Sequence, residues 1–242
     1  MERMITYENL PRFAYSNDRE IKGRIRAVVI CFFGLGKTVM LDEPNEDALF
    51  FAARDVVWLY PYNNPWCWMN RQAVSYTDEC VEAIFDHYCL PDTTPVISTG
   101  GSMGGQSALT YMAYARRTPA GCVVNCPVCD LPYHFTERPD LPRTLYSAFG
   151  TYDCGMEEAL RSASPLHLAQ EGRMPRAAYT VFHCGDDHAV NIHQHSDRFV
   201  EEMRKTRDIE YVVVPDRDHC KLGPEYYPQY LSAMLRAAGI GE

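Results

Sequence analysis

The sequence predicts an α/β fold, in which helices cover both faces of a mostly parallel, twisted sheet. Short apolar runs recur along the chain and alternate with longer segments of helical spacing. One run, Pro95-Val96-Ile97-Ser98-Thr99, continues into the small-residue turn Gly100-Gly101-Ser102-Met103-Gly104, which leads into a helix-like segment at 105–117. Parallel strands need such helical crossovers, so the alternation favours a parallel sheet over an antiparallel one.

The individual elements follow from the same pattern. The run at 27–33 is continuously apolar and is typical of a strand buried on both faces. The strands expected after it are 55–60, 96–99, 122–126, 179–184 and 210–214. The helices expected are 47–54, 71–88, 105–117, 191–205 and 225–238. In the second helix, one apolar face is formed by Val74, Cys80, Val81, Ile84 and Phe85. Residues 5–17 are expected to add an antiparallel pair at the sheet edge.

One segment interrupts the alternation. Residues 130–171 separate the fourth and fifth strands and are too many for a simple crossover. The segment contains several prolines and the aromatic residues Tyr133, Phe135, Tyr146, Phe149 and Tyr152. We expect a small cap insertion beside the site, within a single domain that spans 1–242. The alternative is a helical crossover with a long surface loop.

Composition excludes several classes of partner. Lys and Arg number 23 and Asp and Glu number 32, so the net charge is −9 and nucleic acid is not an expected partner. The start, Met1-Glu2-Arg3-Met4-Ile5-Thr6-Tyr7, has no apolar signal core, and no segment is long and apolar enough to span a membrane. Ten cysteines without such a signal predict reduced thiols and a cytoplasmic location. The sequence gives no oligomeric state.

The turn at Ser102 has the pattern G-x-S-x-G. A serine on a tight strand-to-helix turn is exposed for nucleophilic attack, and the helix N-terminus favours a developing oxyanion. The small residues are needed because larger side chains would collide with the crossing strand and helix. Ser102 is therefore the candidate nucleophile.

A serine needs a base and an acid that orients the base. Two later segments supply them, His183-Cys184-Gly185-Asp186-Asp187-His188-Ala189-Val190 and Pro215-Asp216-Arg217-Asp218-His219-Cys220. Both follow expected strands, as Ser102 does, so the three groups can converge at the carboxyl edge of the sheet. We take His219 as the base and Asp187 as the acid, with Asp186 and Asp130 as the alternative acids.

With these residues the chain resembles the α/β-hydrolase superfamily, over roughly residues 25 to 240. It is most similar to small esterases related to dienelactone hydrolases and to the catalytic domains of prolyl oligopeptidases. The resemblance rests on the serine turn, on the Asp-x-x-Val pattern that ends at Val190, and on the last strand followed by His219. In that family the acid stands three residues before such a valine, which favours Asp187 over Asp186. Dienelactone hydrolases carry a cysteine nucleophile, so Ser102 does not imply their activity.

The resemblance also implies an oxyanion hole. One donor would be the backbone N–H of Met103, and the second would come from the loop Phe33-Gly34-Leu35-Gly36, where we choose Leu35. A histidine often opens this loop in related enzymes, and Phe33 takes its place here.

Three other patterns suggest different chemistry. Gly34-Leu35-Gly36-Lys37-Thr38 is similar to a phosphate-binding loop, but the first glycine of G-x-x-x-x-G-K-[ST] falls at Cys31. Cys122, Cys126 and Cys129 have iron–sulfur spacing, yet strand residues four apart are about 13 Å from each other. Of the histidines in the 183–195 segment, positions 193 and 195 would point in opposite directions on a helix, and His195 falls on its inward face. We therefore predict neither a metal nor a cofactor.

An aromatic loop follows the second strand, Tyr60-Pro61-Tyr62-Asn63-Asn64-Pro65-Trp66-Cys67-Trp68-Met69-Asn70. Its stiff apolar wall suits an aromatic or small acyl or alcohol group, with Tyr62, Trp66, Trp68 and His188 as candidate binding residues. Alternatively, the two tryptophans only pack the loop onto the body.

The sequence therefore predicts a carboxylesterase that acts on a small-molecule ester through an acyl-enzyme. A peptidase or amidase with the same residues is the first alternative, disfavoured because the sequence holds no length for a gating domain. A non-catalytic binder of the same fold is the second.

Overall fold

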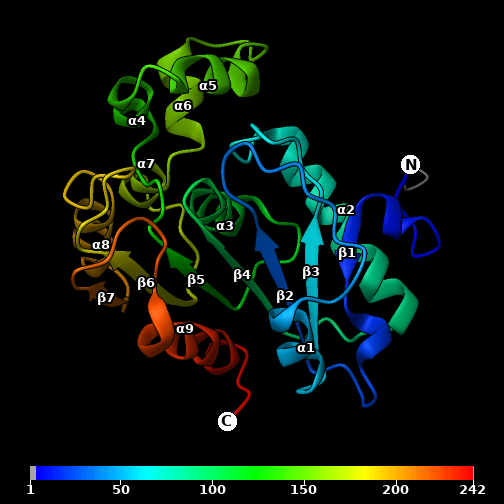
Figure 1. The fold of residues 1–242 in the computed structure, drawn as a ribbon. Coiled ribbons are helices and arrows are strands. Elements are labelled where there is room, and N and C mark those ends of the chain that lie inside the picture. Colours follow the sequence, from blue (N-terminus) through cyan, green and yellow to red (C-terminus); the bar gives the residue numbers. More distant parts are fainter. Residues whose placement is uncertain (1–3, 242) are drawn as a thin grey trace.

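Seven strands form one sheet in the computed structural model, which describes residues 4–241 (Figure 1). The strands are β1 (Ala14–Ser16), β2 (Ala27–Phe32), β3 (Val56–Pro61), β4 (Val96–Gly101), β5 (Gly121–Asn125), β6 (Ala178–Cys184) and β7 (Glu210–Val214). They lie in the order β1-β3-β2-β4-β5-β6-β7, and all neighbours run parallel except β1, which is antiparallel to β3. The predicted α/β fold is confirmed. The first three residues of the N-terminal segment considered above lie outside the described range.

The strand order reverses beside β2. The chain passes from β2 to β3 on one side of it and then returns to β4 on the other side. Connections leave such a switch point in opposite directions, and open α/β sheets commonly gather their functional groups there, at the carboxyl ends of the strands. Ser102 follows β4, and the loop 33–36 follows β2, with Phe32 paired to Gly100 in the register. The sheet therefore brings the candidate nucleophile and the candidate oxyanion loop to neighbouring positions at one edge.

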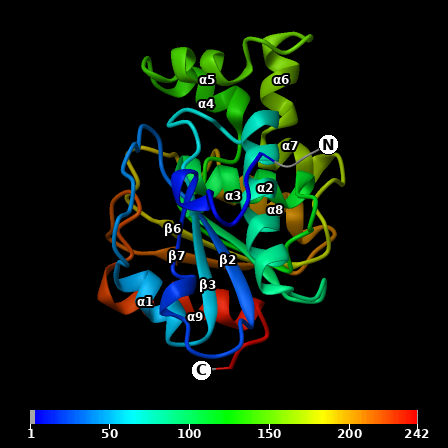
Figure 2. The ribbon, with the colours of Figure 1, turned by 90° about the vertical axis from the view of Figure 1, so that its right-hand side faces the viewer.

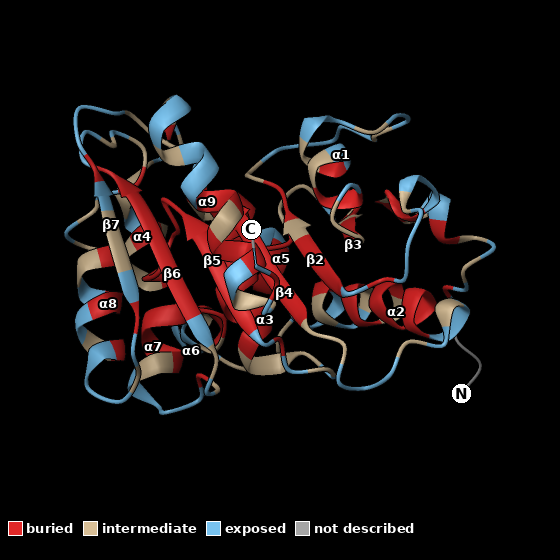
Figure 3. Ribbon diagram, turned by 90° about the horizontal axis from the view of Figure 1, so that it is seen from below, coloured by how far each residue is buried: buried red, intermediate tan, exposed pale blue. Residues whose placement is uncertain are grey.

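Helices cover both faces of the sheet (Figures 1 and 2). One face packs against α1 (Glu46–Ala52) and α9 (Gly223–Ala237). The other packs against α2 (Arg71–Tyr88), α3 (Met103–Tyr114), α7 (Pro165–Gln170) and α8 (Ser196–Arg204). Figure 3 shows the central strands buried, whereas β7 at the edge is largely exposed or half-buried. This double cover explains the continuous apolar runs of the central strands.

Local sequence sets the bounds of α2. The Asn70 side chain accepts a hydrogen bond from the Ala73 N–H at 2.9 Å, which caps the first turn. Cys89 ends the helix in a left-handed conformation with φ 49°. Four predicted apolar positions, Cys80, Val81, Ile84 and Phe85, are buried, and Val74 is half-buried.

The segment 130–171 folds into four helices, α4 (Leu131–Glu137), α5 (Leu141–Phe149), α6 (Met156–Ser162) and α7. In both views α4, α5 and α6 stand together at the top of the molecule, away from the sheet (Figures 1 and 2). We call these three helices the cap group. The division of the chain into one domain with a cap stays a prediction.

Two predicted elements are wrong in extent. Of residues 5–17, all within the described range, only 14–16 form a strand, preceded by the 3₁₀ turn η1 (Leu10–Arg12) and followed by η2 (Asp18–Glu20). The helix expected from residue 191 begins at Ser196. The reason is local, because the Asn191 side chain accepts the N–H groups of His193 and Gln194 and folds a turn instead. No helix among the described residues has the length and apolarity needed to cross a membrane.

Candidate active site

The turn between β4 and α3 holds Ser102 at φ 59° and ψ −125°. Such a backbone conformation costs a non-glycine residue on the order of 1–3 kcal/mol, so the surroundings must hold it in place. The Ser102 N–H donates to the Asn125 carbonyl at 3.0 Å, and the Ser102 carbonyl accepts the Gln106 N–H at 3.0 Å. The strained serine is therefore fixed between β5 and the first turn of α3, as the G-x-S-x-G pattern predicts.

Close backbone approach explains the glycines of this turn. A β-carbon on Gly104 would lie 2.1 Å from the carbonyl oxygen of Phe32 in β2. One on Gly100 would lie 2.5 Å from the backbone of Gly104. Real β-carbons do not approach other atoms so closely, so the crossing of strand and helix requires glycine at both positions.

The predicted acid and base lie in direct contact. Asp187 Oδ2 is 2.7 Å from His219 Nδ1. The other carboxylate oxygen accepts the N–H groups of Ala189 at 2.8 Å and Val190 at 2.9 Å. The Asp187 side chain is fully buried, at the loop that follows β6, and His219 stands on the loop after β7. Because Nδ1 donates to the carboxylate, the second ring nitrogen of His219 is left to accept a proton.

A buried histidine that the sequence analysis did not assign to the site also contacts the acid. His183 Nε2 is 3.3 Å from Asp187 Oδ2 and 3.2 Å from the Val190 carbonyl, while Nδ1 is 2.6 Å from the Ser196 hydroxyl. Both neighbours of Nε2 are acceptors, so we assign the proton to Nε2 and let the serine hydroxyl donate to Nδ1. His183 thus holds the same carboxylate oxygen of Asp187 that His219 contacts. The only sequence signal was its place four residues before the acid.

The two alternative acids lie elsewhere. Asp186 is exposed. Asp130 caps α4, where it accepts the Tyr133 N–H at 3.0 Å, and its second oxygen is 2.6 Å from the Arg198 guanidinium. Asp187 is the one of the three acids whose carboxylate is hydrogen-bonded to His219.

Electrostatics follow from these contacts. Burial alone would raise the pKa of Asp187, but hydrogen bonds from His183 and His219 outweigh it and hold that pKa well below its usual range. Burial lowers the pKa of His219, whereas the contact with Asp187, together with one to Cys126, raises it to about 9. The pair is therefore an imidazolium and a carboxylate at neutral pH.

The residues next to Ser102 and His219 in the chain, Gly101 and Cys220, lie close together. A β-carbon on Gly101, which precedes Ser102, would lie 3.1 Å from the Cys220 sulfur, and that sulfur is 3.7 Å from His219 Nε2. Within the described residues, no hydrogen bond joins the Ser102 hydroxyl to His219. Nucleophile–base hydrogen bonds of hydrolases are often long before substrate binds and tighten in the complex.

The candidate oxyanion donors lie on both sides of the serine. Met103 is the first residue of α3, where an N–H has no carbonyl partner within the helix. On the other side, a β-carbon on Gly34 would be 3.9 Å from the Ser102 β-carbon, so the loop with Leu35 passes beside the turn. Phe33 is buried, with its ring centroid 5.5 Å from that of Tyr60.

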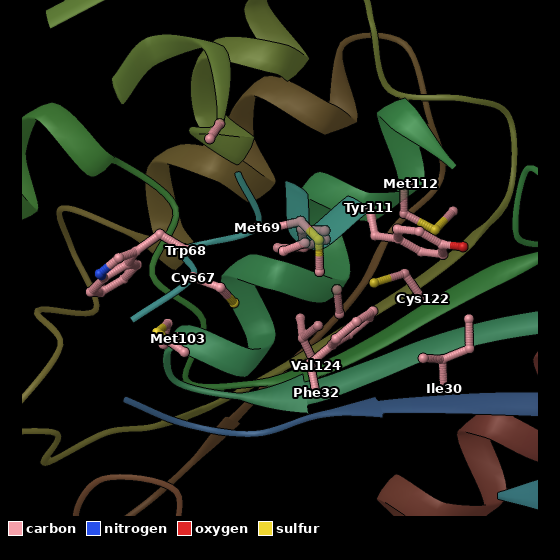
Figure 4. Close-up of a cluster of buried hydrophobic side chains, with 14 of the residues drawn as sticks. Ile30, Phe32, Cys67, Trp68, Met69, Met103, Tyr111, Met112, Cys122 and Val124 are labelled. Carbon is pink, nitrogen blue, oxygen red and sulfur yellow. The ribbon is translucent and has the colours of Figure 1, made fainter. Parts of the chain in front are cut away.

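The aromatic loop after β3 divides into buried and accessible residues. Trp68 is 1% exposed, and its indole N–H donates to the Thr144 hydroxyl of α5 at 3.1 Å. Figure 4 shows it among buried side chains such as Met69 and Met103. Trp68 thus packs in the main hydrophobic core and against α5 of the cap group. Trp66 is half-buried and lines a cavity of about 200 Å³ between this loop and α5.

The two remaining candidate binding residues differ in setting. Tyr62 lines the same cavity, and its hydroxyl is 3.1 Å from both the N–H and the carbonyl of Leu41. His188 is 85% exposed, and its Nδ1 is 3.4 Å from the Asp218 carboxylate, on the loop that carries His219.

A second buried polar cluster joins the cap group to the acid loop. Glu137 of α4 accepts hydrogen bonds from His134 Nδ1 at 2.6 Å, His195 Nε2 at 3.0 Å and the Asn191 N–H at 3.2 Å. His195, a core histidine as predicted, accepts the N–H groups of Cys129 and 130 on its Nδ1. Burial would raise the pKa of Glu137, but the two histidines hold it well below its usual range. Contrary to the prediction, residues 193 and 195 do not lie on a helix, because both precede α8.

Comparison with known proteins identifies the family. The family described as "Prolyl oligopeptidase family" matches residues 69–236, well over half of the chain. No curated protein matches the chain significantly.

Solved structures show the same fold. A puromycin-hydrolysing peptidase of Mycobacterium tuberculosis superposes with a TM-score of 0.72 at 17% identity, over 91% of this chain and 35% of that one. Dipeptidyl peptidase 4 of Porphyromonas gingivalis gives 0.70 at 14% identity, over 93% and 33%. Esterase 2 of Thermogutta terrifontis gives 0.62 at 15% identity, over 90% and 85%. The chain thus spans about a third of the length of these peptidases.

Proposed function

The chain belongs to the prolyl oligopeptidase family, and on this premise we propose that it is a serine hydrolase that cleaves carboxylic esters through Ser102, His219 and Asp187. The observation that carries the proposal is the strained serine turn at the same sheet edge as a buried, hydrogen-bonded Asp–His pair. Ester bonds are the less demanding substrate for such a site, because an alkoxide leaves more readily than an amine.

In the proposed reaction, His219 Nε2 takes the proton of the Ser102 hydroxyl as the serine oxygen attacks the ester carbonyl. Asp187 keeps the imidazole in the tautomer that leaves Nε2 free and stabilises the cation that forms. Its fully buried carboxylate supports this role, since a charge in a dry site interacts strongly with the ring.

The tetrahedral oxyanion is bound by the backbone N–H groups of Met103 and Leu35. His219 then gives its proton to the leaving alkoxide, and an acyl-enzyme on Ser102 remains. Water attacks that ester with His219 again as the base, which releases the acid and restores the serine hydroxyl.

We propose that the acyl or alcohol group lies against the aromatic loop. Trp66 is supported there by the Arg143 guanidinium, 5.4 Å from its ring centroid, and shares a cavity with Tyr62. Such a wall favours small or aromatic groups over long chains. His188, exposed beside the base loop, is the candidate polar contact for the other end of the substrate.

The test is Ser102→Ala with a short p-nitrophenyl ester. Turnover is expected to fall on the order of 10⁶-fold while thermal unfolding stays cooperative. A fluorophosphonate probe should label the native chain at Ser102 and leave the variant unlabelled. Ser75→Ala, at an exposed position on α2, is the matched control and should keep full activity and labelling. A folded Ser102→Ala protein with undiminished turnover would refute the proposal.

A peptidase or amidase is the second candidate, favoured by the family match. A dipeptide anilide and a p-nitrophenyl ester with the same acyl part separate the two, since both pass through the same acyl-enzyme. A kcat/KM for the anilide that equals or exceeds that for the ester would replace the esterase by a peptidase. Absence of both fluorophosphonate labelling and turnover would leave a non-catalytic binder.

A further inference from the structure

Three side chains with metal-binding atoms meet beside the proposed base. They are Cys126, just after β5, and His219 and Cys220, on the loop after β7. The two sulfur atoms and a ring nitrogen of His219 all lie within 4.8 Å of one another. Cys220 Sγ is 3.7 Å from His219 Nε2. The mechanism proposed above uses neither thiol.

These separations fit a tetrahedral zinc ion. Zinc–sulfur bonds of about 2.3 Å and zinc–nitrogen bonds of about 2.0–2.1 Å place tetrahedral ligand atoms about 3.6–3.8 Å apart. The distance from Cys220 Sγ to Nε2 already has this value. The other separations need to shorten by at most about 1 Å, which side-chain rotation can supply. Two thiolates and an imidazole are also the ligand types that zinc prefers.

The outer contacts of the ligands suit a metal. Cys126 Sγ accepts the backbone N–H groups of Cys184 at 3.3 Å and Cys220 at 3.4 Å, which hold the sulfur in place. The Nδ1 side of His219 is hydrogen-bonded to Asp187, so the ring offers Nε2 in the carboxylate–histidine–zinc arrangement common in zinc proteins. Hydrogen bonds therefore hold both Cys126 and His219 in position.

The cluster is also reachable from solvent. Cys126 is fully buried, but Cys220 is half-buried and the His219 side chain is 23% exposed. An ion can therefore bind first to His219 and Cys220 and then reach the inner thiol. The three protein ligands leave one of the four tetrahedral positions for water.

We propose that Cys126, Cys220 and His219 Nε2 form a Zn²⁺ site, and that bound zinc inhibits the hydrolase. Binding forms two Zn–S bonds and one Zn–N bond, and each thiol and the Nε2 of the His219 imidazolium release a proton to solvent. The inhibition rests on the proposed function, because zinc takes the lone pair with which His219 would accept the serine proton. The binding itself does not depend on that function.

Binding is tested without reference to activity. Equilibrium dialysis of the reduced, full-length chain is expected to give one tightly bound Zn²⁺ per chain, and Co²⁺ in its place should show a thiolate-to-metal charge-transfer band. Cys126→Ala and Cys220→Ala should each weaken zinc binding at least about tenfold and remove the band. Cys89→Ala, which removes an exposed thiol, and His193→Gln, which removes an exposed imidazole, should change neither.

Two outcomes would overturn the site. One is zinc binding of equal affinity in the native chain and in both cluster variants. The other is loss of binding in His193→Gln, which would move the ion to the surface.

Inhibition is tested in the same four variants with a p-nitrophenyl ester. Zinc should suppress turnover of the native chain, Cys89→Ala and His193→Gln, and a chelator should restore that turnover. Inhibition of Cys220→Ala should need at least about tenfold more zinc. A native chain that binds zinc at the cluster yet keeps full turnover would overturn the inhibition and the base role of His219, while the metal site would stand. If the native chain binds no zinc and Ser102→Ala abolishes turnover, the metal site is overturned and the hydrolase assignment stands.

Discussion

Asp187→Asn tests the acid–base pair, because it removes a charge while it keeps the shape of the side chain. The Asn oxygen can still accept the N–H groups of Ala189 and Val190. The new amide group then faces His219 Nδ1 and His183 Nε2, both of which donate to the native carboxylate. Donor would meet donor on both sides, so the His219 proton should move to Nε2, the atom that must stay free to act as a base.

The structure sets the size of the effect. His219 has a pKa of about 9 instead of 6.5, an interval that corresponds to on the order of 3 kcal/mol in favour of the imidazolium. This is an upper bound for Asp187, because Cys126 also contributes. Removal of the carboxylate should return the pKa toward 6.5, and the wrong tautomer should lower kcat on the order of 10³–10⁴-fold.

The assay is kcat/KM for a p-nitrophenyl ester against pH, corrected for spontaneous hydrolysis. The base must be neutral, so the native rate should rise about tenfold per pH unit below about 9 and level off above it. In Asp187→Asn the rising part of the pH profile, its limb, should move toward pH 6.5, and the plateau value of kcat/KM should fall. A variant that keeps the limb near 9, or loses less than about tenfold of the plateau, would refute the reasoning.

The same pair has a stability readout. The folded chain binds the His219 proton more tightly than the unfolded chain, because the pKa is raised by folding. This contribution is fully present below about 6.5 and is lost as the pH rises through about 9. The free energy of unfolding, measured with urea, should therefore fall across that interval in the native chain and stay flatter in the variant. Equal slopes would show that Asp187 does not hold the charge.

Two further changes test the turn and the cap group. Gly104→Ala places a β-carbon 2.1 Å from a β2 carbonyl oxygen, so it should lower the free energy of unfolding by more than about 2 kcal/mol, whereas Gly155→Ala, with open space around it, should change it by less than about 0.5 kcal/mol. Glu137→Gln removes the charge that accepts hydrogen bonds from His134 and His195, and should cost about 1–3 kcal/mol in urea unfolding. Equal stability of the two alanine variants, or no loss in Glu137→Gln, would contradict the packing described.

Local sequence was enough for the parallel strands and for the serine turn. A strand covered on both faces must be apolar along its length, so 27–33 and 122–126 stood out without knowledge of their neighbours. The glycines around Ser102 likewise indicate their own surroundings, because a close crossing of backbones requires glycine there. The bounds of α2 were also local, since Asn70 provides its cap.

Long-range contacts could not be predicted from the sequence. Nothing near His183 announces that its ring turns back to Asp187 and the Val190 carbonyl. The packing role of Trp68 depends on Thr144, 76 residues away, so the aromatic loop could not be divided into wall and core in advance. The start of α8 was missed because the Asn191 side chain closes a separate turn with two N–H groups, and the helix begins only at Ser196.

The loop that carries the acid has two anchors, and only one of them bears on catalysis. Asp187 is held by His183, His219 and the loop's own N–H groups. Among the described residues, none of those contacts comes from the cap group. Glu137 instead reaches the loop at Asn191, four residues after the acid. Weakening the cap anchor should therefore lower stability before it alters the pH limb of the reaction. A Glu137→Gln variant with a displaced limb would show that α4 and the acid move as one unit.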